Sequence, residues 1–422
     1  MRYAPAILLG RIVRKLARWR KPGGGSAIPG LVVNRIAPGF LPRSLNSFPG
    51  GLVIVTGSSG KSTTTKMLVA ALRAHGTVVF TNQSTANISQ GLTSALLEQA
   101  SLSGHITGDI AVLEMDEGHG ALISGTLTPR VVALTNVMVD QIDRFHDSDM
   151  VVAMLAKIAA RATGTVVVNA DDQYLTDLAA RLPVSSAVAR YGVSADVLAD
   201  NPRGLGYSAT TATRLDAGEG MLLTSVQGRR ATVSIAGVDY PLGLPARGTH
   251  YAVDALTALC TAQAALGDRF DPVLAINAIS AIPPVFGRGE IVTVRGQQVE
   301  FVLVQNPASF QLNVDSLEPK TEQILIAIGS DVRDPSYFWP VNTSGLGRVR
   351  IASGSKAHDI ALQLVYDDVV VDRIEPNLGL ALDDFLALPE PLTGLKTIIF
   401  SADSMRRTRT HLGLVTNKEK QE

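Results

Sequence analysis

The stretch LVIVTGSSGKST, residues 52–63, carries the strongest structural signal in this chain. Residues 52–56 are an unbroken apolar run, which predicts a buried strand, and residues 63–74 predict a helix with apolar side chains on one face. Between them lies a loop bounded by Gly57 and Gly60. Glycines let backbone N–H groups approach an anion, and the start of a helix favours negative charge. The order strand, glycine loop and helix therefore predicts a phosphate-binding loop.

Two side chains give this loop the chemistry of an ATP site. Lys61 would offset charge on the β- and γ-phosphates, and the Ser62 hydroxyl would bind Mg²⁺. The loop is shorter than the general motif, because Val55 stands where the first glycine of that motif would be. The alternative is a glycine turn that follows a strand by chance. Lys61 is also a candidate catalytic residue, and the candidate nucleotide-binding residues of the loop are Gly57, Ser58, Ser59, Gly60, Lys61, Ser62 and Thr63.

Three further apolar runs predict strands like the first one. Residues 110–114, 131–135 and 165–169 are continuous rather than alternating, which is typical of a parallel sheet covered on both faces. Enough chain separates them for crossover helices. We therefore expect an α/β fold with a doubly wound, mainly parallel sheet.

Changes in composition divide the chain into three parts. Residues 1–45 are a basic helix and loop, and residues 46–288 form the expected ATP-binding domain. Within it, residues 190–245 are rich in Thr, Ser, Gly and Arg and predict a small β-rich insertion or extension, followed by a helix from about His250 to Leu266. Residues 289–422 predict a smaller Rossmann-like α/β domain, with β runs at 299–304, 323–328, 368–371 and 397–401.

Residues 1–21 predict a basic amphipathic helix, with apolar residues such as Ile12 and Leu16 at helical spacing. This helix would attach weakly to an anionic membrane surface, or it would pack on the body of the protein. Five basic residues follow the short apolar run at its start, whereas a secretory signal places them before it. Residues 22–26 predict a loop.

Bulk composition excludes several classes of protein. The 38 basic and 38 acidic side chains balance, so the chain has no general charge for binding nucleic acid. No run of about 18 apolar residues predicts a membrane span. The lone Cys260 lies in an apolar run, which fits a buried position and excludes an internal disulfide and a four-cysteine zinc site. We expect a cytoplasmic protein without zinc.

The short loop, Gly57 to Thr65, resembles that of the Mur ligase and folylpolyglutamate synthetase superfamily, whose members join a carboxylate to an amine through an acyl-phosphate. Residues 112–117, 134–136, 140–145 and 169–172 resemble further elements of the superfamily. The resemblance implies that Glu114 helps to bind Mg²⁺, that Asn169 lies near adenine, and that His250 and Arg288 belong to the nucleotide site. The alternatives are a solvated acid for Glu114, a turn cap for Asn169, capping or packing for His250 and a linker charge for Arg288.

Within this superfamily the chain resembles the MurT family, the ligase-like subunits of lipid II isoglutaminyl synthase. The resemblance rests on the short N-terminal region, on residues 305–310 and on residues 333–339. It implies amidation of the α-carboxyl of D-glutamate in the lipid II stem peptide, with ammonia from a Cys-His glutaminase partner and the substrate at the membrane surface. Asp334 aligns with the aspartate that completes the partner's catalytic triad, Asp331 is its nearby rival, and a turn-forming role is the alternative for both.

Several departures from the family bear on this interpretation. Ser58, Ser59 and Ser62 replace residues of the usual loop, although Ser62 keeps a hydroxyl for magnesium. Residues 190–230 lack the ligands of the zinc ribbon that many members have. A ligase that adds an amino acid is therefore the first alternative function, and a non-catalytic scaffold that binds nucleotide is the second.

Overall fold

The computed structural model describes residues 3–20, 27–82, 88–138, 147–184, 186–211, 215–216, 218–283, 287–318, 321–333 and 338–414. The helices are α1 (Ala4–Arg20), α2 (Ile28–Ile36), α3 (Phe40–Leu45), α4 (Lys61–Ala74), α5 (Ser89–Gln99), α6 (Glu117–Ile123), α7 (Ser148–Ala159), α8 (Gln173–Ala180), α9 (Ala195–Ala199), α10 (Thr249–Leu266), α11 (Pro272–Ser280), α12 (Pro307–Ser316), α13 (Ala357–Tyr366), α14 (Leu378–Ala387) and α15 (Ala402–His411). Short 3₁₀ turns are η2 (Ser124–Thr126), η3 (Gly267–Arg269) and η5 (Ser344–Leu346).

A nine-stranded sheet organises the first part of the chain, in the order β2-β3-β1-β4-β5-β6-β7-β8-β9. Its strands are β1 (Leu52–Thr56), β2 (Val79–Thr81), β3 (Ile110–Glu114), β4 (Val131–Leu134), β5 (Thr165–Asn169), β6 (Ala187–Val193), β7 (Met221–Gln227), β8 (Arg230–Ile235) and β9 (Val238–Gly243). The strands from β2 to β7 pair in parallel, as the continuous apolar runs predicted. The expected doubly wound α/β fold is confirmed.

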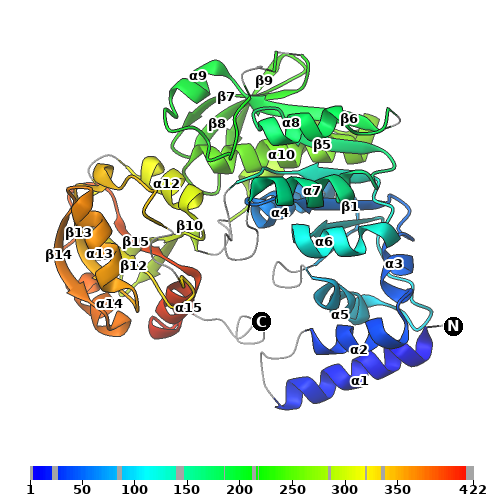
Figure 1. Cartoon of the computed structure of the whole chain (residues 1–422), viewed down its shortest axis with the longest axis horizontal. Helices are drawn as coiled ribbons and strands as arrows, with labels where there is room; N and C mark the ends of the chain where they lie inside the picture. The colour runs from blue at the N-terminus through cyan, green and yellow to red at the C-terminus, as the bar shows by residue number, and fades with distance from the viewer. Residues whose placement is uncertain are drawn as a thin grey trace.

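The pleat of β1 shows why its apolar run is unbroken. Val53 and Val55 face the core formed with α4, α10 and α11, whereas Leu52 and Ile54 face the core formed with α5, α7 and α8. Successive side chains of a strand point to opposite faces, so a strand covered on both sides needs an apolar residue at every position. Helices on both faces appear in Figure 1.

The β-rich region at 190–245 is an extension of the main sheet. Strand β6 pairs with β7 in parallel, and β7, β8 and β9 continue as an antiparallel meander. No separate sheet is inserted among the described residues of this region. The predicted helix start at residue 63 was also late, because α4 begins at Lys61, directly after Gly60.

A second, six-stranded sheet organises the last part of the chain, in the order β10-β11-β15-β12-β13-β14. Its strands are β10 (Arg288–Val294), β11 (Gln297–Leu303), β12 (Ile324–Ala327), β13 (Arg348–Ser353), β14 (Val370–Glu375) and β15 (Lys396–Phe400). All pairs are parallel except the β10–β11 hairpin. One face packs against α12 and α13, and the other against α14 and α15. Figure 1 shows this lobe beside the larger one.

The N-terminal helix packs on the body of the protein. The side chains of Tyr3, Ala6 and Ile7 are buried, and α1 contacts α2 and α5. Gly10 lets the helices approach closely, because a Cβ there would lie 2.7 Å from Val33 and 2.8 Å from Leu97. Among the described residues, no helix is long and apolar enough to cross a membrane.

Candidate active site

The phosphate loop has backbone geometry that only glycine adopts without strain. Gly57 has φ of +135° and Gly60 has φ of +81°, both outside the range of ordinary side chains. A Cβ on Gly57 would lie 2.3 Å from the Thr135 hydroxyl oxygen, and one on Gly60 would lie 2.1 Å from a carboxyl oxygen of Asp254. Because α4 begins directly after this loop, its unpaired N–H groups face the loop. The loop and the start of α4 therefore fit a nucleotide phosphate.

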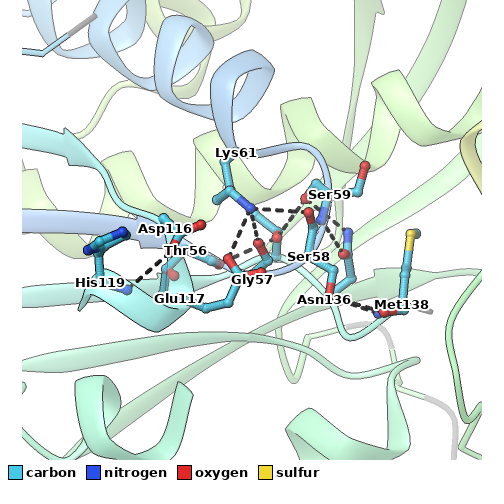
Figure 2. A network of polar contacts seen from close by, with 11 residues as sticks. Thr56, Gly57, Ser58, Ser59, Lys61, Asp116, Glu117, His119, Asn136 and Met138 are labelled. Carbon is cyan, nitrogen blue, oxygen red and sulfur yellow. Dashed lines mark hydrogen bonds and ion pairs between the residues drawn. The ribbon is translucent and has the colours of Figure 1, made fainter. Parts of the chain in front are cut away.

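The segment after β4 holds the loop in place. The Ser59 amide donates to Asn136 Oδ1 at 2.9 Å, and the Asn136 amide donates back to the Ser59 carbonyl at 3.2 Å. The Thr135 hydroxyl donates to the same carbonyl at 2.7 Å, and the Ser58 hydroxyl bonds to the backbone of Met138. Figure 2 shows Asn136 and Met138 against the serines of the loop. Side-chain and backbone contacts within the chain thus define the shape of the loop.

Lys61 folds over the loop toward a buried carboxylate. Its ammonium donates to the carbonyls of Gly57 and Ser58 and pairs with Glu117 Oε2 at 3.1 Å. Glu117 is only 2% exposed and opens α6, with Asp116 as the N-cap that accepts from the His119 amide at 3.0 Å. These contacts converge from the ends of β1 and β3 (Figure 2).

The position of this ion pair follows from the topology. Strand β1 lies between β3 and β4, and α4 and α6 leave the ends of β1 and β3 toward opposite faces of the sheet. Ligands of open α/β sheets bind where the connections diverge in this way. Glu117 was missed as a site residue. It lies three residues beyond Glu114 in the same acidic segment, and that clustering of carboxylates was the available signal.

The two predicted magnesium ligands, Glu114 and Ser62, lie at or after the ends of two neighbouring strands, β3 and β1. Glu114 ends β3 opposite Val55 of β1, and its backbone exchanges two hydrogen bonds of 3.0 Å with the Asn82 side chain. Its side chain is buried. Ser62 is the second residue of α4 and is half-buried. A carboxylate and a hydroxyl are suitable ligands for Mg²⁺, so the residues present fit this ion. Their binding of magnesium stays a prediction.

Arg288 reaches the phosphate loop from the start of β10. Its guanidinium donates to the Thr63 hydroxyl at 3.1 Å and to Gln305 Oε1 at 3.1 Å. Thr63 is buried in the first turn of α4. Arg288 thus joins the helix that follows the loop to the segment before α12, and its contact with a phosphate stays a prediction.

His250 and Asp254 lie one helical turn apart near the start of α10. The His250 ring lies over Gly248 and 4.1 Å from the Tyr251 ring, and burial together with Arg288 lowers its pKa to about 3, so it is neutral. Burial raises the pKa of the Asp254 carboxyl to about 8, although Arg288 opposes the rise. Asp254 therefore places no full negative charge beside Gly60 at neutral pH. The sequence prediction included His250 but missed Asp254, four residues on along the same helix face.

Asn169 makes the turn contact that was its alternative role. Its side chain is fully buried, accepts from the Asp171 amide at 3.0 Å and donates to the Tyr207 hydroxyl at 2.8 Å. A contact with adenine stays a prediction.

The structure describes one of the two candidates for the partner's triad. Asp334 lies outside the described residues. Asp331 accepts hydrogen bonds from the Ser401 hydroxyl at 2.7 Å and from the Asp403 amide at 3.1 Å. Its carboxylate therefore fixes the start of α15, which favours a structural role for Asp331.

Comparison with known proteins agrees with this geometry. Residues 55–262 match the family model of the Mur ligase middle domain, and residues 303–390 match the model named MurT ligase C-terminal. The chain belongs to the Mur ligase superfamily. The matched middle domain contains the phosphate loop, Glu114, Glu117 and His250, and the second match begins just before Gln305.

Curated relatives in the Mur ligase superfamily include two MurT subunits of lipid II isoglutaminyl synthase. The one from Streptococcus pneumoniae is 26% identical, over 85% of this chain and 86% of that protein. The one from Staphylococcus aureus is 30% identical, but the match spans only 46% of this chain and 43% of that relative. The crystal structure of MurF ligase from Thermotoga maritima in complex with ADP has the same fold, with a TM-score of 0.65, 18% identity and coverage of 90% and 82% of the two chains.

We predict that replacing Glu117 with glutamine strengthens the binding of ADP in the absence of magnesium by about tenfold, since the charge-assisted hydrogen bond that directs the Lys61 ammonium toward Glu117 is weakened. Titration calorimetry in EDTA measures this change. Glu98→Gln is the control, because Glu98 pairs with Arg14 on α1, away from the loop. Weaker ADP binding by Glu117→Gln would instead mean that Glu117 holds Lys61 in its binding position.

We also predict that the purified protein carries no stoichiometric zinc. The single cysteine cannot supply a zinc ribbon, and the described residues contain no group of three or more His, Cys, Asp or Glu side chains suited to a metal. Elemental analysis measures the metal content, and about one zinc per chain would contradict the prediction.

Proposed function

We propose that this chain is an ATP-dependent carbon–nitrogen ligase that amidates the α-carboxyl of D-glutamate in the lipid II stem peptide. The observation that carries the proposal is the phosphate loop with Lys61, joined through Arg288 to a C-terminal domain that matches the MurT model. The MurT subunits from Streptococcus pneumoniae and Staphylococcus aureus support the substrate and the product, D-isoglutamine.

The chemistry needs ATP because a carboxylate does not react with ammonia. A carboxylate oxygen attacks the γ-phosphorus and ADP leaves, so that an acyl-phosphate forms. Ammonia then attacks the acyl carbon, the bond from carbon to the phosphate oxygen breaks, and inorganic phosphate and a proton leave. Lys61 would bind the phosphates and offset charge as the phosphoryl group moves.

Other residues would orient the reactants. Arg288 already touches the first turn of α4, and from there its charge would reach a phosphate on the loop. Ser62 and Glu114 would hold Mg²⁺, which when bound neutralises charge between the phosphates. Because the Asp254 carboxyl beside Gly60 is mainly neutral at pH 7, it would not repel the phosphates on the loop.

Ammonia would come from a partner with a Cys-His pair, because this chain does not offer a thiol for glutamine hydrolysis. Cys260 is buried in α10, and burial raises the pKa of its thiol to about 12. A thiol in that state is not a nucleophile at neutral pH. In the proposed complex Asp334 would orient the partner's histidine.

The alternative ligase adds an amino acid, and the nucleophile distinguishes the two reactions. We expect lipid II-dependent ATP hydrolysis to require ammonium, or glutamine with the partner, and to be unaffected by amino acids. Stimulation by an amino acid in place of ammonium would favour the alternative. ATP hydrolysis that is absent with every nucleophile would favour the nucleotide-binding scaffold, which the intact Lys61, Ser62 and Glu114 argue against.

The proposed substrate places the reaction at the inner face of the membrane. Lipid II carries its stem peptide on a lipid anchor, so a cytoplasmic enzyme must reach the bilayer surface.

A further inference from the structure

Residues 1–97 contain no aspartate or glutamate. The whole chain has equal numbers of basic and acidic side chains, yet its first carboxylate side chain is Glu98. Nine lysines and arginines precede residue 50. Among the described residues of this part, Lys15, Arg35 and Arg43 are exposed. The helices α1 to α3 therefore form a positively charged region on a neutral protein.

Helix α1 has an exposed apolar face. The side chains of Leu8, Leu9, Ile12 and Leu16 are 47%, 42%, 56% and 59% exposed. At 3.6 residues per turn, these four positions share one arc of about 100°. The opposite side of the helix carries the buried Tyr3, Ala6 and Ile7. The apolar arc thus points away from the body of the protein.

Helix α2, which packs against α1, also carries exposed apolar residues. Ile28, Leu31 and Ile36 are each at least half exposed, and Arg35 is exposed among them. The buried Pro29, Gly30 and Val33 form its inner side. Figure 1 shows α1 and α2 side by side along one edge of the molecule. We call the seven exposed apolar residues of α1 and α2, together with Lys15 and Arg35, the outer N-terminal face.

Polar contacts hold the inner sides of α1 and α2 against α5, so the exposed apolar residues stay on the outside. Arg11 donates to the carbonyls of Leu97 and Ala100 at the end of α5, and Arg14 pairs with Glu98. Ser94 of α5 accepts from the Gly30 amide at 2.9 Å. The structure shows the predicted packing on the body, and this packing leaves the exposed apolar residues of α1 free for the alternative role, attachment to an anionic membrane surface.

We propose that the outer N-terminal face docks on an anionic phospholipid bilayer. Apolar side chains on a basic, acid-free helix enter the boundary between headgroups and acyl chains, while lysine and arginine attract the lipid phosphates. A second copy of the chain is a poorer occupant, because two acid-free surfaces of like charge would repel each other. The proposal goes beyond the amidation reaction and does not depend on it.

Cosedimentation of the full chain with vesicles tests this surface. We expect binding to vesicles that contain phosphatidylglycerol, much weaker binding to phosphatidylcholine vesicles, and loss of binding at high salt. The double substitution Ile12→Glu and Leu16→Glu should lower the partition coefficient by at least about tenfold. Both residues are exposed, so the fold and the affinity for ADP should not change.

One control variant and one charge variant distinguish binding through this face from a general effect of added negative charge. Leu122→Glu changes an 80% exposed leucine on α6 and should bind vesicles like the unaltered chain. Lys15→Glu with Arg35→Glu should weaken binding to the anionic vesicles only. Absence of binding to anionic vesicles, or equal binding by the Ile12 and Leu16 variant, would overturn the proposal. So would a dimer in light scattering that the same variant dissociates, since the face would then bind a second copy.

Discussion

Replacing Lys61 with alanine should lower ATP turnover by at least about 10²-fold while the chain remains folded. The ammonium is the cation of the phosphate loop, and removing one group that stabilises a transition state commonly costs this much. Its partners are two loop carbonyls and Glu117, so the core of the sheet is untouched. A coupled assay of ADP release, with circular dichroism on the same samples, measures both quantities.

Lys66→Ala is the matched control for this change. Lys66 lies on the same helix, but its side chain is directed to the Pro283 carbonyl, 3.4 Å away, and not to the loop. We expect its turnover to stay close to that of the unaltered chain. A folded Lys61→Ala variant with unchanged turnover would remove the phosphate loop from the mechanism.

Asp334→Asn should abolish amidation that depends on glutamine and leave amidation with ammonium salts largely intact. If Asp334 completes the triad of a separate glutaminase, its loss leaves the partner's histidine in the wrong tautomer, which costs as much as about 10⁴ in rate. In that role Asp334 acts outside the ligase site, so the substitution should leave the reaction with ammonium unchanged. The measurement is the rate of amide formation with the partner present, once with glutamine and once with an ammonium salt.

Asp331→Asn is the control in the same segment. Because Asp331 accepts from Ser401 and Asp403, this variant should lower thermal stability and should not distinguish between the nitrogen sources. Equal loss with glutamine and ammonia in Asp334→Asn would place Asp334 in the ligase site or in the fold. No loss with either would make it an ordinary turn residue.

Most of the strands that the sequence predicted contain continuous apolar runs, whereas β14, predicted in part by residues 368–371, is largely exposed. Strands β1 and β3 are apolar at four of five positions, and β5 and β15 at three successive positions, because helices cover both faces of their sheets. Strands β10 and β13 were missed, because polar residues such as Arg348 and Arg350 alternate with apolar ones and β10 lies at the edge of its sheet. The pattern detects burial, and a partly exposed strand gives a weaker signal.

The site was predictable where one segment carries it and not where distant segments meet. Gly57 to Ser62 form a local motif. The contact of Lys61 with Glu117 joins residues 56 positions apart, and that of Arg288 with Thr63 joins residues 225 apart. Asn136 was noted only as part of a family motif, and its role in holding the loop depends on β4 lying beside β1. Such contacts follow from topology and not from spacing along the chain.

Transfer of labelled nitrogen tests the proposed reaction most directly. The chain would be incubated with ATP, Mg²⁺, lipid II and ¹⁵N-ammonium chloride, and the stem peptide analysed by mass spectrometry. We predict ¹⁵N in the α-carboxamide of the D-glutamate residue, with ADP and phosphate released in equal amounts to the amide. ATP hydrolysis that leaves the α-carboxyl free, or attachment of an amino acid at that carboxyl, would contradict the proposed function.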